Sequence, residues 1–205
     1  MADAPHRAPH LHLHTVVLTA LLSLGLGGCS TLLPEPEPAP NRFDLGPFLE
    51  PGPINAGLAG LRLKSLRAPS WLNVEQIRYR QLHRRPEAVQ HYAAHVWNAP
   101  PPEMLAVRLE QMLAVDGDAT ERWHLEVEIL SFEQVFTSAS DARASILLRA
   151  ALSQRGGDRV QQRSFSAKVP VTADVDGAIE GLPKVADRVL RELLVWAAEV
   201  TTSSR

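Results

Sequence analysis

The sequence is poor in several features that mark specialised proteins. Its 205 residues include one cysteine, 5 % aromatic residues and a formal net charge of only −2. A single cysteine excludes a disulfide scaffold and any metal site built from several cysteines. The near balance of acids and bases argues against a nucleic-acid-binding protein, whose domain is normally strongly basic. Apolar residues still make up 45 % of the chain, so we expect one folded domain with a buried core.

The apolar run at residues 16–28 is too short to span a bilayer as a helix, which needs about 20 residues. Its length is typical of the apolar region of a signal peptide. Arg7 is the only basic residue before the run. Four histidines, His6, His10, His12 and His14, take the positions where lysines are usual. The last three alternate with apolar residues and could instead be metal ligands. We expect the whole segment to be removed, so the metal interpretation is not favoured.

The run ends in Leu26-Gly27-Gly28-Cys29, which resembles the bacterial lipobox. That resemblance implies a diacylglycerol on the Cys29 thiol, cleavage between Gly28 and Cys29, and acylation of the new amino group. The alternative is a cysteine buried in the core. Ser30 resembles the residue that favours sorting of such lipoproteins to the outer membrane.

Proline occupies every second position from Pro34 to Pro40. Proline fixes φ and removes backbone donors, so this stretch predicts a semi-rigid extended tether, roughly 35–40 Å long over residues 30–41. The expected organisation is therefore a cleaved signal peptide at 1–28, a lipidated cysteine with a proline-rich tether at 29–41, and one domain at 42–205.

The domain combines short alternating runs, typical of strands, with two helical patterns. Strands are expected at 42–48, 61–67, 76–82, 88–93, 123–136 with a bulge near Leu130, 144–152 and 159–171. One helix opens at Pro100–Pro102. A terminal helix buries a stripe from Ile179 to Val200 and either kinks or begins at Pro183, with an outer i,i+4 pair between Asp187 and Arg191. The fold class is α+β: an antiparallel sheet with two main helices packed on one face, in a single domain.

No nucleophile elbow, phosphate-binding loop, dinucleotide fingerprint or zinc-protease motif occurs in the sequence. His91 and His95 are four residues apart and could hold zinc on a helix, but their surroundings read as a strand and no third ligand is evident. Glu126 and Glu128 share one strand face, where solvated side chains are the simpler interpretation than a catalytic pair. We therefore expect a protein that is not an enzyme and holds no metal.

Basic residues are concentrated between residues 62 and 85. They form either a solvated strand face or a patch for an acidic partner or anionic head groups. The cluster consists of Arg62, Lys64, Arg67, Arg78, Arg80, Arg84 and Arg85.

Several stretches, in order along the chain, resemble the ABC-type transport auxiliary lipoproteins, a family that includes the lipoprotein of the paraquat-inducible Pqi system. Phe43 stands where a tyrosine is expected, and a third proline lengthens the proline pair. The stretches are Arg42–Pro47, Ala68–Leu72, Ile77–Arg80, Tyr92 followed by Trp97–Pro101 and Met104-Leu105, and Phe132–Phe136.

This resemblance implies a non-enzymatic lipoprotein at the periplasmic face of the outer membrane. It would work with a substrate-binding protein of the mammalian-cell-entry (MCE) type, beside an ABC permease and ATPase, in moving lipids or other hydrophobic molecules between membranes. It implies no catalytic residues and no cofactor beyond the acyl chains on Cys29. Alternatives are a module that itself carries acyl chains, a general envelope-assembly lipoprotein, or an envelope hydrolase. Homo-oligomerisation is compatible with ring-forming MCE partners.

The aromatic residues of the resembling stretches are most simply interpreted as core or sheet-packing residues. If they lie on the surface, they would anchor a protein partner together with the neighbouring arginines. The candidate partner surface consists of Trp71, Arg78, Tyr79, Arg80, Tyr92 and Trp97.

Overall fold

The computed structural model describes residues 38–47, 58–113, 122–157 and 160–203. The chain divides into two units, residues 1–38 and 39–205, and every helix and strand named below belongs to the second. The expected signal peptide, the lipid attachment site at Cys29 and the part of the tether before residue 38 lie outside the described residues.

Strand β5, Trp123–Phe136, is the central element of the sheet. β6, Ala142–Gln154, pairs antiparallel with it over its whole length, and β7, Val160–Val171, pairs antiparallel with β6. The ladder between β5 and β6 shifts between Ile129 and Ser131, which confirms the bulge expected near Leu130. At the β6–β7 turn, Gly156 adopts a φ of 76°, a conformation that glycine adopts without steric cost.

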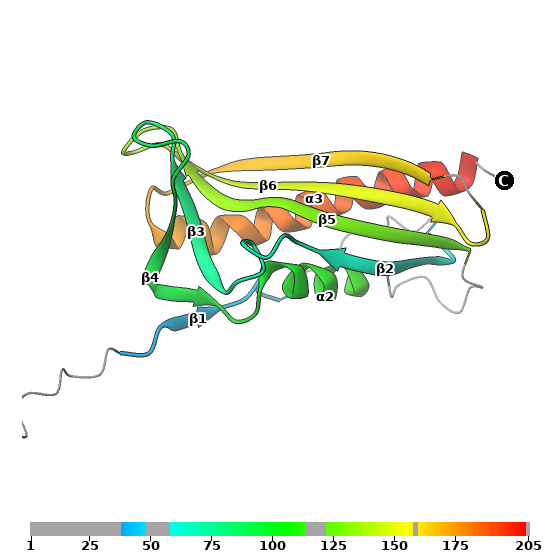
Figure 1. The fold of residues 1–205 in the computed structure, drawn as a ribbon, viewed down its shortest axis with the longest axis horizontal. Coiled ribbons are helices and arrows are strands. Elements are labelled where there is room, and N and C mark those ends of the chain that lie inside the picture. The colour runs from blue at the N-terminus through cyan, green and yellow to red at the C-terminus, as the bar shows by residue number, and fades with distance from the viewer. Residues whose placement is uncertain (1–37, 48–57, 114–121, 158–159, 204–205) are drawn as a thin grey trace, which may run out of the picture. The chain divides into compact units, whose positions relative to one another are not determined.

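Two strands share the other edge of β5. β2, Leu61–Arg67, runs parallel to the first half of β5, and β3, Gln76–Gln81, runs parallel to its last residues. β4, Val89–Trp97, is antiparallel to β3, and the three-residue β1, Asn41–Phe43, is parallel to the end of β4. The result is a seven-stranded mixed sheet, mostly antiparallel (Figure 1). Together with the two helices it confirms a single α+β domain.

The two helices cover one face of this sheet. α3, Val175–Ser203, packs along β6 and β7, and α2, Pro101–Leu113, packs against β2 (Figure 1). Strand residues alternate between this covered face and an open face, because successive side chains point to opposite sides. Leu125, Val127 and Ile129 are buried beneath the helices, whereas Glu126 and Glu128 lie on the open face.

Helix α3 runs without interruption through Pro183, so the alternative that the helix begins at Pro183 is wrong. Its start is set earlier by Asp174, whose carboxylate accepts hydrogen bonds from the Gly177 amide at 2.9 Å and the Thr172 hydroxyl at 2.8 Å. Most of the expected apolar stripe is buried, from Leu182 to Val200. Burial of the helix therefore follows its 3.6-residue periodicity.

The first expected strand, at residues 42–48, ends after Phe43. Asp44 accepts a hydrogen bond from the Gly46 amide at 2.7 Å, and Gly46 has a φ of 70°. These two features turn the chain out of the extended conformation, because an Asx turn competes with strand pairing. Phe48 lies outside the described residues.

Candidate functional site

Strand β4 is broken in the middle. Gln76 pairs with Val96, and Arg78 pairs with His91, so two steps along β3 correspond to five along β4. Three β4 residues are therefore unmatched, and the strand bends sharply between its halves (Figure 1). The first half stays on β3, while the second half carries β1.

Trp71 lies in the turn that leads into β3. The Leu72 amide donates to the Pro69 carbonyl at 2.9 Å, and Leu72 is buried. With Leu72 directed into the core, Trp71 faces outward and is 53 % exposed. The guanidinium of Arg78 lies 5.1 Å from the centre of the Trp71 ring and donates to the Trp71 carbonyl. Such stacking of a cation on an indole is favourable and orients both groups.

Arg78 differs electrostatically from its neighbours. Arg80 pairs with Glu133 at 3.1 Å and also donates to the Pro86 carbonyl. Arg78 has no carboxylate partner among the described residues. Partial burial lowers the pKa of Arg78, the nearby Glu133 opposes this, and Arg80 adds to it. Arg78 is therefore a partly desolvated cation held by Trp71.

A surface hollow of about 270 Å³ lies at the first half of β4. It is bordered by two valines, two glutamines, an arginine and a histidine: Val74, Gln76, Arg78, Val89, Gln90 and His91. The break in the β3–β4 ladder adjoins this hollow, because the unmatched residues begin directly after His91. We call the hollow together with Trp71 the Trp71 surface.

Three residues of the expected partner surface lie elsewhere. Trp97 is completely buried, with its ring 5.7 Å from that of Phe132, so its assignment to a surface is wrong and its core interpretation holds. Tyr79 and Tyr92 are half-buried and pack together at 4.7 Å. The Tyr92 hydroxyl donates to Gln134 at 2.6 Å, and burial raises the pKa of Tyr92 well above its ordinary value. These side chains hold β4 onto β5.

The basic cluster predicted from the sequence is divided by ion pairs on the open face. Lys64 contacts Glu126 at 2.7 Å, and Arg149 of β6 lies 3.6 Å from Glu128. The hydrogen bond from Lys64 lowers the pKa of Glu126. The two glutamates therefore hold cations of neighbouring strands, an arrangement that suits the solvated interpretation rather than an acid–base pair.

His91 and His95 lie on strand β4 rather than on a helix. His95 stacks on Phe43 at 5.7 Å, while His91 borders the hollow. Within the described ranges, no group of three or more histidine, cysteine, aspartate or glutamate residues is arranged to hold a metal ion. In the same part of the chain, no helix combines the length and apolarity needed to cross a membrane.

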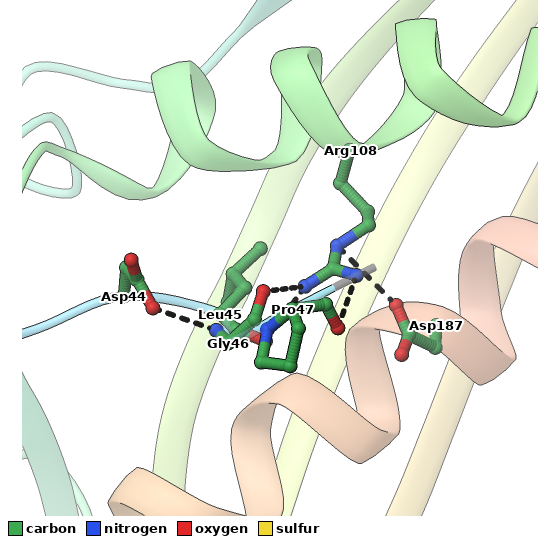
Figure 2. Close-up of polar contacts among 6 residues, drawn as sticks. All are labelled: Asp44, Leu45, Gly46, Pro47, Arg108 and Asp187. Atoms are coloured by element: carbon green, nitrogen blue, oxygen red, sulfur yellow. Dashed lines mark hydrogen bonds and ion pairs between the residues drawn. The ribbon is translucent and has the colours of Figure 1, made fainter. Parts of the chain in front are cut away.

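A second polar arrangement was not expected from the sequence. Arg108 of α2 is only 3 % exposed, and its guanidinium donates to the carbonyls of Leu45 at 2.6 Å, Gly46 at 2.8 Å and Pro47 at 3.3 Å. Figure 2 shows the three carbonyls converging on Arg108 from one side and Asp187 of α3 from the other. We call this arrangement the Arg108 junction.

The sequence did contain a signal for this junction. Arg108 lies between Leu105 and Leu109 on the buried stripe of α2, where a charged residue needs a partner. A charged residue on an apolar stripe predicts a buried polar contact but not which segment supplies it. Asp187, expected to pair with Arg191, instead forms its ion pair with Arg108. Burial raises the pKa of Asp187, and the two arginines oppose that effect.

The family model of the ABC-type transport auxiliary lipoprotein component matches residues 50–193, well over half of the sequence. The chain belongs to this family. The auxiliary lipoprotein family is the one indicated by the ordered stretches of sequence, and the family's name describes an accessory component rather than a catalyst. The match begins after β1 and the Asp44–Pro47 loop, yet Arg108 ties that loop into the folded domain.

Solved structures show the same fold. A crystal structure of a Xanthomonas campestris protein assigned to the family model DUF330 matches with a TM-score of 0.66 at 22 % identity, covering 82 % of this chain and 96 % of the other. A crystal structure of an uncharacterised protein matches with a TM-score of 0.56 at 15 % identity, covering 80 % and 99 %. No curated protein matches the sequence.

Proposed function

We propose that the protein is a non-enzymatic adaptor of the cell envelope, anchored by acylated Cys29 at the periplasmic face of the outer membrane. The domain docks an MCE-domain protein that works with an ABC permease and ATPase in the transport of lipids or other hydrophobic molecules. The observation that carries this proposal is the exposed Trp71 with Arg78 stacked on it. Tryptophan and arginine are the residues most often found at the energetic centre of protein interfaces.

The position of Trp71 relative to β1, the first strand of the domain, supports this function. The tether enters the domain at β1, which pairs with the second half of β4, while the first half of β4 borders the hollow beside Trp71. Arg42 of β1 pairs with Glu75, in the turn that carries Trp71, at 2.8 Å. The docking surface thus adjoins the point where the lipid-anchored segment enters the domain.

The alternative of an acyl-carrying module receives less support. Such a module needs an enclosed apolar cavity between sheet and helices, but in the described part of the chain the helix side chains at that interface are buried against the sheet. Leu182, Val185 and Leu193 of α3 are fully buried against the sheet. A hollow of about 310 Å³ bordered by Met104 and Arg108 and the Trp71 hollow of about 270 Å³ are both open at the surface, whereas a carried acyl chain needs to be enclosed.

Co-purification of the full-length acylated protein from membranes tests the adaptor function. We expect an MCE-domain protein to be enriched, and Trp71→Ala to reduce that enrichment about ten-fold or more. Val195→Ala is the matched control, because Val195 is an exposed apolar residue on α3. Enrichment of envelope-assembly proteins instead, or of stoichiometric phospholipid without any MCE protein, would contradict the proposal in favour of the alternatives.

A further inference from the structure

The acids nearest the Trp71 surface already have partners. Glu133 is held by Arg80 at 3.1 Å, and Glu75 by Arg42 at 2.8 Å. Arg78 borders the hollow, and no carboxylate among the described residues does. The hollow therefore carries a positive charge, and the nearby glutamates are already paired with other arginines. A carboxylate from outside the chain is the group that complements it.

Arg78 is prepared for such a ligand. Its guanidinium is held in place by the Trp71 ring and carbonyl, and the residue borders the hollow. A side chain that is already held in one position loses little conformational freedom when a ligand binds it. The planar guanidinium also matches the two oxygens of a carboxylate.

The other walls of the hollow limit the size and polarity of the ligand. Val74 and Val89 provide apolar contacts, and Gln76 and Gln90 provide amides that can bond to a peptide backbone. A volume of about 270 Å³ accommodates one or two side chains rather than a whole lipid. This favours a segment of a protein over a bilayer.

We propose that the hollow beside Trp71 binds an aspartate or glutamate side chain of the partner protein, with Arg78 as the charged donor and Trp71 covering the bound segment. This inference rests on the proposed docking function and specifies its chemistry. Arg78 sets which segment of the partner is accepted, and Trp71 supplies apolar contact area.

The test measures the dissociation constant of full-length acylated protein in detergent for the MCE-domain protein. We expect Arg78→Gln to weaken binding roughly thirty-fold or more, as for other truncated interfacial charge pairs. Arg78→Lys should give an intermediate loss, because lysine keeps the charge but not the planar fork. Arg143→Gln is the matched control: Arg143 is exposed on β6 and has no ion-pair partner in the described part of the chain, so this variant should bind as wild type.

A photo-crosslinker at position 90, at the border of the hollow, then identifies the carboxylate of the partner. In the partner, that aspartate or glutamate is replaced by asparagine or glutamine. In a double-mutant cycle, that change should have little further effect in the Arg78→Gln background. Wild-type affinity of Arg78→Gln, or a loss without coupling to any partner carboxylate, overturns the inference. If Trp71→Ala still weakens binding in that case, the docking function stands; if neither variant weakens it, both fail.

A lipid head group is the competing anion. The same affinities are measured in nanodiscs of phosphatidylethanolamine with and without phosphatidylglycerol. A loss with Arg78→Gln that occurs only when phosphatidylglycerol is present would assign the hollow to a membrane surface and overturn the inference.

Discussion

Oδ1 of Asp187 on α3 lies 3.5 Å from Nε of Arg108 on α2. The two partners are buried very unequally, with side-chain exposures of 3 % for Arg108 and 34 % for Asp187. Arg108 also donates to three carbonyls of the 45–47 loop. One side chain therefore joins two helices and the N-terminal loop, and its removal would affect all three.

Replacement of Arg108 by methionine should lower the free energy of unfolding by about 2–4 kcal/mol, because the buried bond to the Leu45 carbonyl and the part-buried bonds to Gly46 and Pro47 are lost. Urea unfolding of the purified protein measures the change. Tryptic cleavage after Arg42 should also become faster, since the loop is no longer held. Arg188→Met is the control, because Arg188 is exposed and its ion pair with Glu192 lies within α3; its expected cost is below about 0.5 kcal/mol. Equal losses for both variants would contradict the role assigned to the junction.

The pH dependence of stability should reveal the state of Asp187. Burial raises the pKa of this carboxyl above the ordinary value of 3.8, despite Arg108. The folded state then binds the proton more tightly than the unfolded state, so stability from Asp187 is complete below 3.8 and declines as pH rises through the folded-state pKa. Unfolding free energies of wild type and Asp187→Asn, compared from pH 3.5 to 6.5, should shift in favour of the variant with rising pH. A shift in the opposite direction would mean that pairing with Arg108 outweighs burial.

Gly181 should tolerate no side chain. A Cβ there would lie 2.9 Å from Cβ of Ala144 on β6 and would also collide with a methyl group of Val171 on β7. Gly181→Ala is expected to destabilise the protein by about 1–3 kcal/mol through overpacking. Thermal unfolding measures the loss. Gly157→Ala is the control, because the nearest atom to its added Cβ is at an ordinary 3.5 Å. Unchanged stability of Gly181→Ala would mean that α3 is less closely packed on the sheet than described.

Cys29→Ala tests the anchor, which lies outside the described residues. We expect loss of palmitate labelling and release of the protein into the soluble periplasmic fraction, because a single cysteine is present to carry the lipid. A Ser30→Ala variant serves as the control for substitution next to the cleavage site and should remain labelled. Persistent labelling of Cys29→Ala would refute the lipobox interpretation.

Local pattern accounts for much of the fold. The alternation at 61–67 and 123–136 and the stripe on α3 predicted elements that the structure contains, because burial on one face imposes a period of 2 on strands and 3.6 on helices. Which strands pair with one another was harder to predict from the sequence. The parallel contacts of β1 with β4 and of β2 with β5 join segments far apart in sequence, and no local period specifies them.

The candidate site was likewise predictable from the sequence only in part. Trp71 and Trp97 have the same chemistry, yet one is exposed and the other is buried, because the turn at Pro69 directs Leu72 inward and Trp71 outward. Arg78 could be identified from the sequence as part of a basic cluster. That the nearby acids are already paired could not, because only the fold brings Glu133 to Arg80 and Glu75 to Arg42. The Arg108 junction depends on three segments meeting and was not predicted.

The short ladder between β1 and β4 also determines where a mechanical force on the N-terminal segment is transmitted to the domain. A pull on the chain before Asn41 is borne first by three residues of β1 and by the loop that Arg108 grips. The load passes from there to β4, which borders the Trp71 surface, and to α2. β5, β6 and β7 do not pair with β1, so tension on an anchored molecule would reach its docking surface before it strained the long ladders of the sheet.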